Sequence, residues 1–254
     1  MTATLPSWLA EIPREQTHPL AFATVSGAHL YGFPSDDSDL DLRGVHVLPV
    51  EEVVGLRHGE ETVTRMWDRD GVEVDLVTHD LAKFCRMLLG RNGYVLEQLL
   101  SPLVVATSPV HEELVAAAPA CVTRHHAHHY LGFARTQWRL FEKSGELKPL
   151  LYTFRTLLTG AHLMRTGEVV ADLTRLYGDA GRWTPPYLPD LVEAKRSAEH
   201  GALPGDAPDL VRLGRDVERL TADLEGARDA SALPDVGSAH EVLHTLVVRT
   251  RLGR

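Results

Sequence analysis

The sequence predicts an α+β protein, in which a small mixed β-sheet is followed by an all-α part. Two observations support this prediction. The short segments up to residue 80 are apolar or alternate between polar and apolar residues, as strands do, whereas later segments repeat their apolar residues with a helical period. The length of 254 residues suits one large domain or two small ones, and we expect two, residues 1–107 and 108–254.

The sheet is expected from the composition of the first part of the chain. The predicted strands are residues 20–26, 39–48, 61–67 and 72–78. The last two flank an Asp-Arg-Asp-Gly turn, which favours a hairpin. A short helix is expected after Pro49, and from His79 onward the apolar residues fall on one helical face.

The remaining part of the chain is expected to be helical. Helices are predicted at residues 93–101, 109–118, 124–143, 148–166, 187–200, 208–227 and 239–252. Ser238 and Glu241 have the spacing of a capping box, which would start the last of these helices. No repeat of 20–50 residues is present, so a solenoid is not expected.

The composition is that of an ordinary globular protein, with 44% hydrophobic and 24% charged residues. The two cysteines, Cys85 and Cys121, form no CxxC pair, which excludes a disulfide framework and a cysteine-rich zinc site. No apolar stretch approaches the ~18 residues of a membrane-spanning helix. The first residues lack a basic segment followed by an apolar one, so we expect no secretory signal, no membrane partner and a cytoplasmic location.

Charge is distributed unevenly along the chain. Residues 34–80 contain 13 acidic and 4 basic residues, a net charge of −9, whereas residues 121–165 contain 7 basic and 2 acidic residues, a net charge of +5. The first block would suit cations and the second would suit phosphate groups, although both could equally be solvated surfaces.

The most informative acidic residues lie in the second predicted strand. Side chains two apart on a strand share a face, so Asp39, Asp41 and Arg43 are expected to project together. Carboxylates this close repel one another unless a cation lies between them, and Mg²⁺ prefers such oxygen ligands. If the strand containing Asp75 lies alongside, three carboxylates could hold two metal ions ~4 Å apart, the arrangement used for phosphoryl and nucleotidyl transfer.

A turn of small residues precedes this strand. Ser26, Gly27, Ala28 and His29 follow an apolar strand and begin a short helix, which would expose backbone N–H groups to a phosphate. Gly27 lies 12 residues before Asp39. This turn alone is a weak signal, but its combination with the later aspartates is a strong one.

The stretch SGAHLYGFPSDDSDLDLRGVHVLP, with Asp75 on a later strand, resembles the signature of polymerase-beta-like nucleotidyltransferases. The closer resemblance is to the RNA-ligase-associated group of this superfamily, which belongs to RNA repair. It extends weakly into the helical part, where the similar pieces are 130–133, 148–150, 191–195 and 199–201.

The resemblance implies a function and a set of site residues. It implies Mg²⁺- or Mn²⁺-dependent transfer of a nucleoside monophosphate, from a nucleoside triphosphate such as ATP, to the 3′ end of an RNA or tRNA. It also implies partner enzymes of RNA repair. The implied metal ligands and catalytic residues are Asp39, Asp41 and Asp75, and the implied nucleotide-binding residues are Ser26, Gly27, Ala28, His29 and Arg43.

The sequence departs from the superfamily pattern at the turn, where Ala28 replaces the usual serine. Phosphate binding would then use backbone N–H groups, Ser26 or Arg43, although Arg43 could instead neutralise the aspartates. Basic and aromatic residues of the helical part are candidates for contacts with the acceptor and its phosphates: Arg135, Arg139, Lys148, Tyr152, Arg155 and Lys195.

Some features of the sequence bear on other functions. A calcium-binding EF-hand starting at Asp37 is excluded, because its sixth and twelfth positions hold Leu42 and Leu48. The same transfer chemistry could act on a protein or a small molecule. The six-residue separation of Arg155 and His162 admits a toxin–antitoxin-type ribonuclease, and Ala28 admits a nucleotide-binding protein without turnover.

Overall fold

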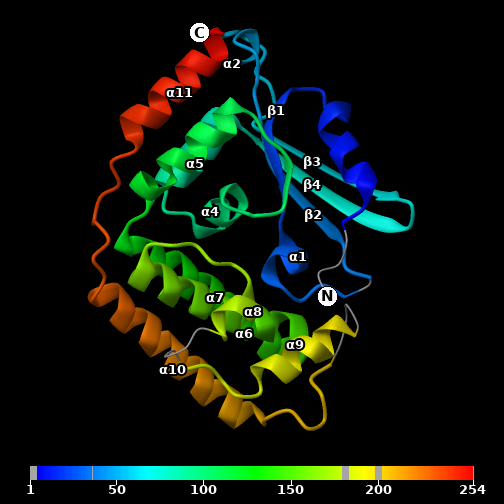
Figure 1. The fold of residues 1–254 in the computed structure, drawn as a ribbon, viewed down its shortest axis with the longest axis vertical. Coiled ribbons are helices and arrows are strands. Elements are labelled where there is room, and N and C mark those ends of the chain that lie inside the picture. Colours follow the sequence, from blue (N-terminus) through cyan, green and yellow to red (C-terminus); the bar gives the residue numbers. More distant parts are fainter. Residues whose placement is uncertain (1–4, 36, 179–182, 198–201, 254) are drawn as a thin grey trace. The chain divides into compact units, whose positions relative to one another are not determined.

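In the computed structural model, residues 5–35, 37–178, 183–197 and 202–253 are described. The chain forms two compact units (Figure 1). The first, here called the sheet unit, comprises Met1–Gly27, Asp39–Val122 and Val236–Arg254. The second, here called the helical unit, comprises Ala28–Ser38 and Thr123–Asp235.

The sheet unit is built on a mixed sheet of the order β3-β4-β2-β1-β5 among the described residues. Only β2 and β4 are parallel to each other, and the other neighbouring strands are antiparallel. The strands are β1 (Leu20–Val25), β2 (Leu40–His46), β3 (Thr62–Arg69), β4 (Val72–Asp80) and β5 (Val104–Ala106). This architecture confirms the predicted α+β class with a small mixed sheet.

The two faces of the sheet pack against different elements. Leu40 and Leu42 of β2 and Leu76 of β4 join Leu9 and Ile12 in one buried cluster. The last two belong to the 3₁₀-helix Ser7–Glu15, which covers this face. In Figure 1 this 3₁₀-helix lies on one side of the strands, and helices α4, α5 and α11 lie on the other. Alternation along the strands therefore turns Asp41, Arg43 and Asp75 away from the cluster.

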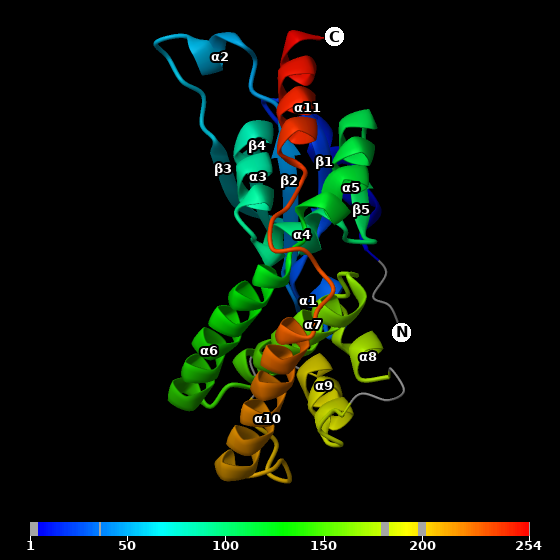
Figure 2. The ribbon, with the colours of Figure 1, turned by 90° about the vertical axis from the view of Figure 1, so that its left-hand side faces the viewer.

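Figure 2 shows the helices of the sheet unit. They are α2 (Glu51–Val54), α3 (Leu81–Leu89), α4 (Gly93–Leu99), α5 (Pro109–Cys121) and α11 (His240–Leu252). Polar side chains cap three of them. Asp80 accepts from Ala82 N at the start of α3, Asn92 accepts from Tyr94 N, and Ser108 accepts from His111 N.

The helical unit is organised around α7, which is buried over most of its length and packs against α6 and α10. Its helices are α1 (Gly27–Tyr31, the first residue of which belongs to the sheet unit), the 3₁₀-helix Arg124–His126, α6 (Ala127–Ser144), α7 (Leu147–Thr166), α8 (Leu173–Leu176), α9 (Leu188–Arg196) and α10 (Leu210–Asp229). None of the helices in the described ranges has the length and apolar character needed to cross a membrane.

The predicted elements are confirmed to within a few residues at their ends, except that the predicted helix 187–200 extends beyond the described residues. The 3₁₀-helix Ser7–Glu15, β5 and α8 were not predicted, because they are short or have no strong period. The prediction of a capping box at Ser238 and Glu241 is wrong. Helix α11 begins at His240 with Ala239 as its N-cap, and no described side chain caps it. Ser238 instead donates its backbone N–H to Ala120 O.

The compact units differ from the predicted single cut between residues 107 and 108. Helices α5 and α11 lie beyond that cut, yet both belong to the sheet unit. The segment Ala28–Ser38 lies before it, yet it groups with the helices. This grouping depends on contacts between distant parts of the chain, which local sequence patterns do not predict.

Within the sheet unit, a buried ion pair joins α11 to the end of β4. Arg251 Nη2 lies 2.5 Å from Asp80 Oδ2, and the two side chains are 11% and 2% exposed. Asp80 also accepts hydrogen bonds from Leu48 N and Ala82 N, so one carboxylate joins the end of β4, the start of α3 and the last helix. Nearby, Arg249 of α11 forms an exposed ion pair with Glu113.

We expect Arg251→Met to lower the free energy of unfolding by about 3 kcal/mol, because it leaves the buried Asp80 carboxylate without its cation. Arg249→Met is the control, and we expect a change of at most about 1 kcal/mol because its ion pair is exposed. Urea unfolding of both variants measures the difference. Equal losses would show that the Arg251–Asp80 pair does not stabilise the fold.

Candidate active site

The site is built by the parallel pairing of β2 and β4. The register of this pair places Asp41 directly opposite Asp75. The flanking residues Leu40, Leu42, Val74 and Leu76 are buried in the apolar cluster of the other face. The hydrophobic pattern of both strands thus fixes which side the two carboxylates occupy, since a shift of one residue would bury one of them.

Arg43 bridges the two carboxylates. Its Nη2 donates to Asp41 Oδ1 at 2.5 Å and to Asp75 Oδ2 at 2.9 Å. Its Nη1 donates to the backbone oxygens of Leu42 and Asp75, at 2.8 and 2.7 Å, and its Nε donates to Tyr94 Oη at 3.0 Å. The guanidinium is therefore held by groups on β2, β4 and α4.

The electrostatics keep Arg43 charged. Burial alone would lower the pKa of its guanidinium, but Tyr94, Asp41 and Asp75 more than offset this and raise that pKa above its ordinary value. The Arg43 side chain is 10% exposed, whereas the side chains of Asp41 and Asp75 are 18% and 22% exposed. The carboxylates thus remain partly open to solvent while a buried cation compensates their charge.

The small-residue turn lies directly against Asp41. Ser26 N donates to Asp41 O at 2.8 Å. Gly27 has φ +60°, and a Cβ at this position would lie 1.8 Å from Asp41 Oδ2. Only glycine fits here, both because of its backbone conformation and because the carboxylate occupies the space of a side chain. The Ser26 hydroxyl is buried and has no hydrogen-bond partner among the described residues.

These residues suit a divalent cation in their chemistry. Asp41 and Asp75 offer adjacent carboxylate oxygens, the ligands that Mg²⁺ prefers, and Asp39 lies two residues before Asp41. Within the described ranges, no three His, Cys, Asp or Glu side chains are grouped closely enough to form a metal site as they stand. Arg43 satisfies the two paired carboxylates instead, so the predicted ligand set remains a prediction.

Other predicted residues gather inside the helical unit. Arg155 is buried, and its guanidinium lies 3.9 Å from the ring centroid of Tyr31. Tyr152 packs edge-on against the same tyrosine, with ring centroids 5.3 Å apart. Lys195 is fully buried, and its Nζ donates to Ser35 Oγ at 3.2 Å. These side chains thus surround the segment that leads to Asp39, and their predicted role in acceptor binding remains a prediction.

The remaining predicted residues are spread over the helical unit. Ala28 is buried and His29 is half-buried in α1. Arg135 and Arg139 are exposed on α6, and Lys148 is half-buried on α7. The piece 199–201, which contributed to the resemblance, lies outside the described residues.

Tyr94 is the site residue that the sequence did not reveal. It follows Asn92, the N-cap of α4, and its hydroxyl accepts a hydrogen bond from Arg43. A single tyrosine in the first turn of a helix has no distinguishing spacing, so only the packing of α4 on the sheet identifies it.

A model of the RNA repair pathway DNA polymerase beta family (RlaP) matches residues 1–249. The chain belongs to this family. The resemblance found in the sequence is thereby confirmed, and membership supports an enzyme of the nucleotidyltransferase kind.

Two individual proteins show how far similarity extends. An uncharacterized protein of Methanocaldococcus jannaschii is 33% identical over 159 residues, which are 60% of this chain and 63% of that protein. The chain thus matches less than two thirds of this relative's length. A nucleotidyltransferase-like protein from Exiguobacterium sibiricum is similar over 95% of this chain and 77% of its own, with 12% identity and a TM-score of 0.33.

We expect Gly27→Ala to destabilise the protein at least twice as much as Gly71→Ala. Both glycines have a positive φ, so each alanine costs about 1 kcal/mol in backbone strain. Only at Gly27 does the new Cβ also collide with Asp41, because nothing lies within 4 Å of the position at Gly71. Urea unfolding compares the two variants, and equal losses would contradict the close contact.

We expect Arg43→Met to lower the free energy of unfolding by about 2 kcal/mol, because it leaves two neighbouring carboxylates without their cation. Their partial exposure keeps this below the loss at a fully buried pair. Arg86→Met, which removes an exposed pair with Glu61 in the same unit, is expected to change stability by at most about 1 kcal/mol. The same denaturant series tests this, and a loss at Arg43 no larger than that at Arg86 would refute the bridging role.

Proposed function

We propose that the protein is a metal-dependent nucleotidyltransferase that transfers a nucleoside monophosphate from a nucleoside triphosphate to an acceptor hydroxyl. One observation supports this most: two carboxylates on adjacent strands stand opposite each other, with a glycine turn packed against one of them. Carboxylate oxygens, which bind a metal ion, thus lie next to a glycine whose backbone a phosphate can approach. Transfer from a metal-bound triphosphate requires both kinds of group.

Each residue has a proposed part in the reaction. Asp39, Asp41 and Asp75 would hold Mg²⁺ or Mn²⁺, which when bound supplies charge neutralisation at the transferring phosphate. Asp75 accepts the proton of the acceptor hydroxyl. The acceptor oxygen forms a bond to the α-phosphorus while the bond to the β-phosphate oxygen breaks, and pyrophosphate leaves. The Gly27 backbone and the Ser26 hydroxyl bind the triphosphate, with Arg43 keeping Asp41 and Asp75 in place.

The proposed acceptor is the 3′ hydroxyl of an RNA, such as a tRNA. The RNA repair pathway in the name of the matching family supports this choice, as does the basic composition of residues 121–165. Enzymes that act on the same broken RNA are the proposed partners, and the cytoplasm is the proposed location.

We expect Asp41→Asn and Asp75→Asn each to reduce transfer at least about 100-fold, because each removes a carboxylate that no neighbour replaces. Glu73→Gln is the matched control, because Glu73 is exposed on the same strand two residues before Asp75. Each protein is incubated with Mg²⁺, an α-labelled nucleoside triphosphate and RNA, and label in RNA is measured together with pyrophosphate. Undiminished transfer by Asp41→Asn would refute the proposed site.

The same assay separates the alternatives for the acceptor. RNA whose 3′ end has been oxidised by periodate has lost its 3′ hydroxyl and should take up no label. Label in protein rather than RNA would indicate a protein acceptor. Triphosphate binding without release of pyrophosphate would contradict the proposed enzyme and indicate a binding protein.

A further inference from the structure

We propose that the groove between α6 and α10 binds an unpaired RNA base that has an amino group, with Trp138 as its stacking surface. This inference rests on the proposed function in one respect, the choice of RNA as the acceptor. The groove lies entirely within the helical unit, so its description needs no other part of the protein.

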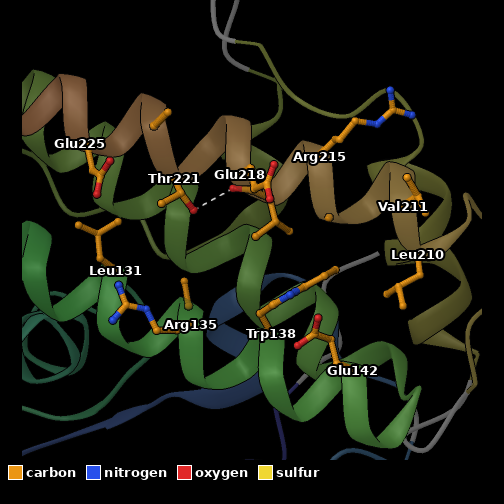
Figure 3. A pocket seen from close by; sticks show the side chains of 14 residues that line it. Leu131, Arg135, Trp138, Glu142, Leu210, Val211, Arg215, Glu218, Thr221 and Glu225 are labelled. Atoms are coloured by element: carbon orange, nitrogen blue, oxygen red, sulfur yellow. Dashed lines mark hydrogen bonds between the residues drawn. The ribbon is translucent and has the colours of Figure 1, made fainter.

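The groove has the volume and the apolar lining of a small-ligand site. Its volume is about 700 Å³, which is within the range of pockets that hold one drug-sized molecule. Leu131, Ala134 and Val217 contribute apolar surface. Figure 3 shows Trp138 reaching from α6 into the space between the two helices. An aromatic ring in an apolar groove is a stacking platform for any base.

A glycine keeps space open beside the indole. Gly214 on α10 faces Trp138, and a Cβ at this position would lie 3.7 Å from Trp138 Cζ2. That distance is an ordinary van der Waals contact, so an alanine would fit, whereas a longer side chain would extend into the groove. Gly214 therefore offers a way to fill the site without a clash in the backbone.

Three cationic side chains lie along α6. Arg135, Arg139 and Lys143 are exposed and follow one another at intervals of four residues, which is about 6 Å along a helix. Within the described part of the chain, none of their side chains forms a hydrogen bond or an ion pair. Arg135 also lines the groove. This row of positive charge complements a sugar-phosphate backbone that runs along α6 while a base enters the groove.

Carboxylates in the groove select among the bases. Glu142 lies beside Trp138, and Glu218 lies on the facing helix (Figure 3). Carboxylates accept hydrogen bonds from the exocyclic amino group of cytosine or adenine, whereas uracil presents a carbonyl oxygen at the corresponding position. The same carboxylates repel phosphate, so the groove suits the base rather than the backbone.

The test measures binding of labelled oligo(rC) and oligo(rU) by fluorescence anisotropy, without nucleoside triphosphate or metal ion. We expect oligo(rC) to bind at least about fivefold more tightly than oligo(rU). We expect Trp138→Leu to weaken oligo(rC) binding at least about fivefold, and Trp138→Phe to retain most of it because a stacking ring remains. Equal binding of the two oligonucleotides, or no effect of Trp138→Leu, would overturn the inference.

Two further pairs control for folding and for charge. Gly214→Met should weaken binding by filling the groove, whereas Gly214→Ala should not. Arg135→Gln should lower the dependence of binding on salt, whereas Arg175→Gln, at an exposed position on α8, should leave it unchanged. Failure of both contrasts would overturn the inference. Self-association that Trp138→Leu abolishes, in the absence of oligonucleotide binding, would also overturn it and indicate a protein-binding groove.

Two measurements on the wild type separate this inference from the proposed function: transfer of label to RNA, and binding of oligo(rC) without metal ion or triphosphate. Transfer without groove binding would leave the proposed function intact and overturn this inference. Groove binding with the wild type inactive would do the reverse.

Discussion

Two carboxylates on neighbouring parallel strands repel each other, and this repulsion is the constraint around which the sheet unit is arranged. Arg43 compensates it from two residues further along β2, with hydrogen bonds to both Asp41 and Asp75. Tyr94 in turn orients Arg43 from α4. A change in any of these four residues therefore alters the balance of charge where Asp41 and Asp75 stand opposite each other.

The topology explains why the carboxylates can meet at all. Strand β3 lies at the edge of the sheet and runs antiparallel to β4. The chain therefore reverses direction before β4, and β4 runs parallel to β2. Asp70 and Gly71 make the tight return possible, because both adopt a positive φ. Aspartates that are 34 residues apart in the sequence thus become opposite neighbours in register.

Local pattern was sufficient for part of this site. Alternation predicts that Asp41 and Arg43 share a face, and the resemblance singles out Asp75. The register of β2 on β4 was not predictable, because apolar alternation fits more than one alignment of two strands. The burial of Arg155 and Lys195 was likewise not predictable from the sequence, since a charged residue on a helix is ordinarily expected to face solvent. The capping box failed because Ser238 uses its backbone to bind Ala120 before the helix starts.

The ion pair between Asp80 and Arg251 joins residues that are 171 positions apart. The ribosome delivers β4 and its carboxylates long before it delivers α11. Because domains fold as units in the order of their synthesis, the helical segment that lies between them can fold while the strands still wait for their last covering helix. The strands that carry Asp41 and Asp75 are thus among the first parts made and the last to reach their final stability.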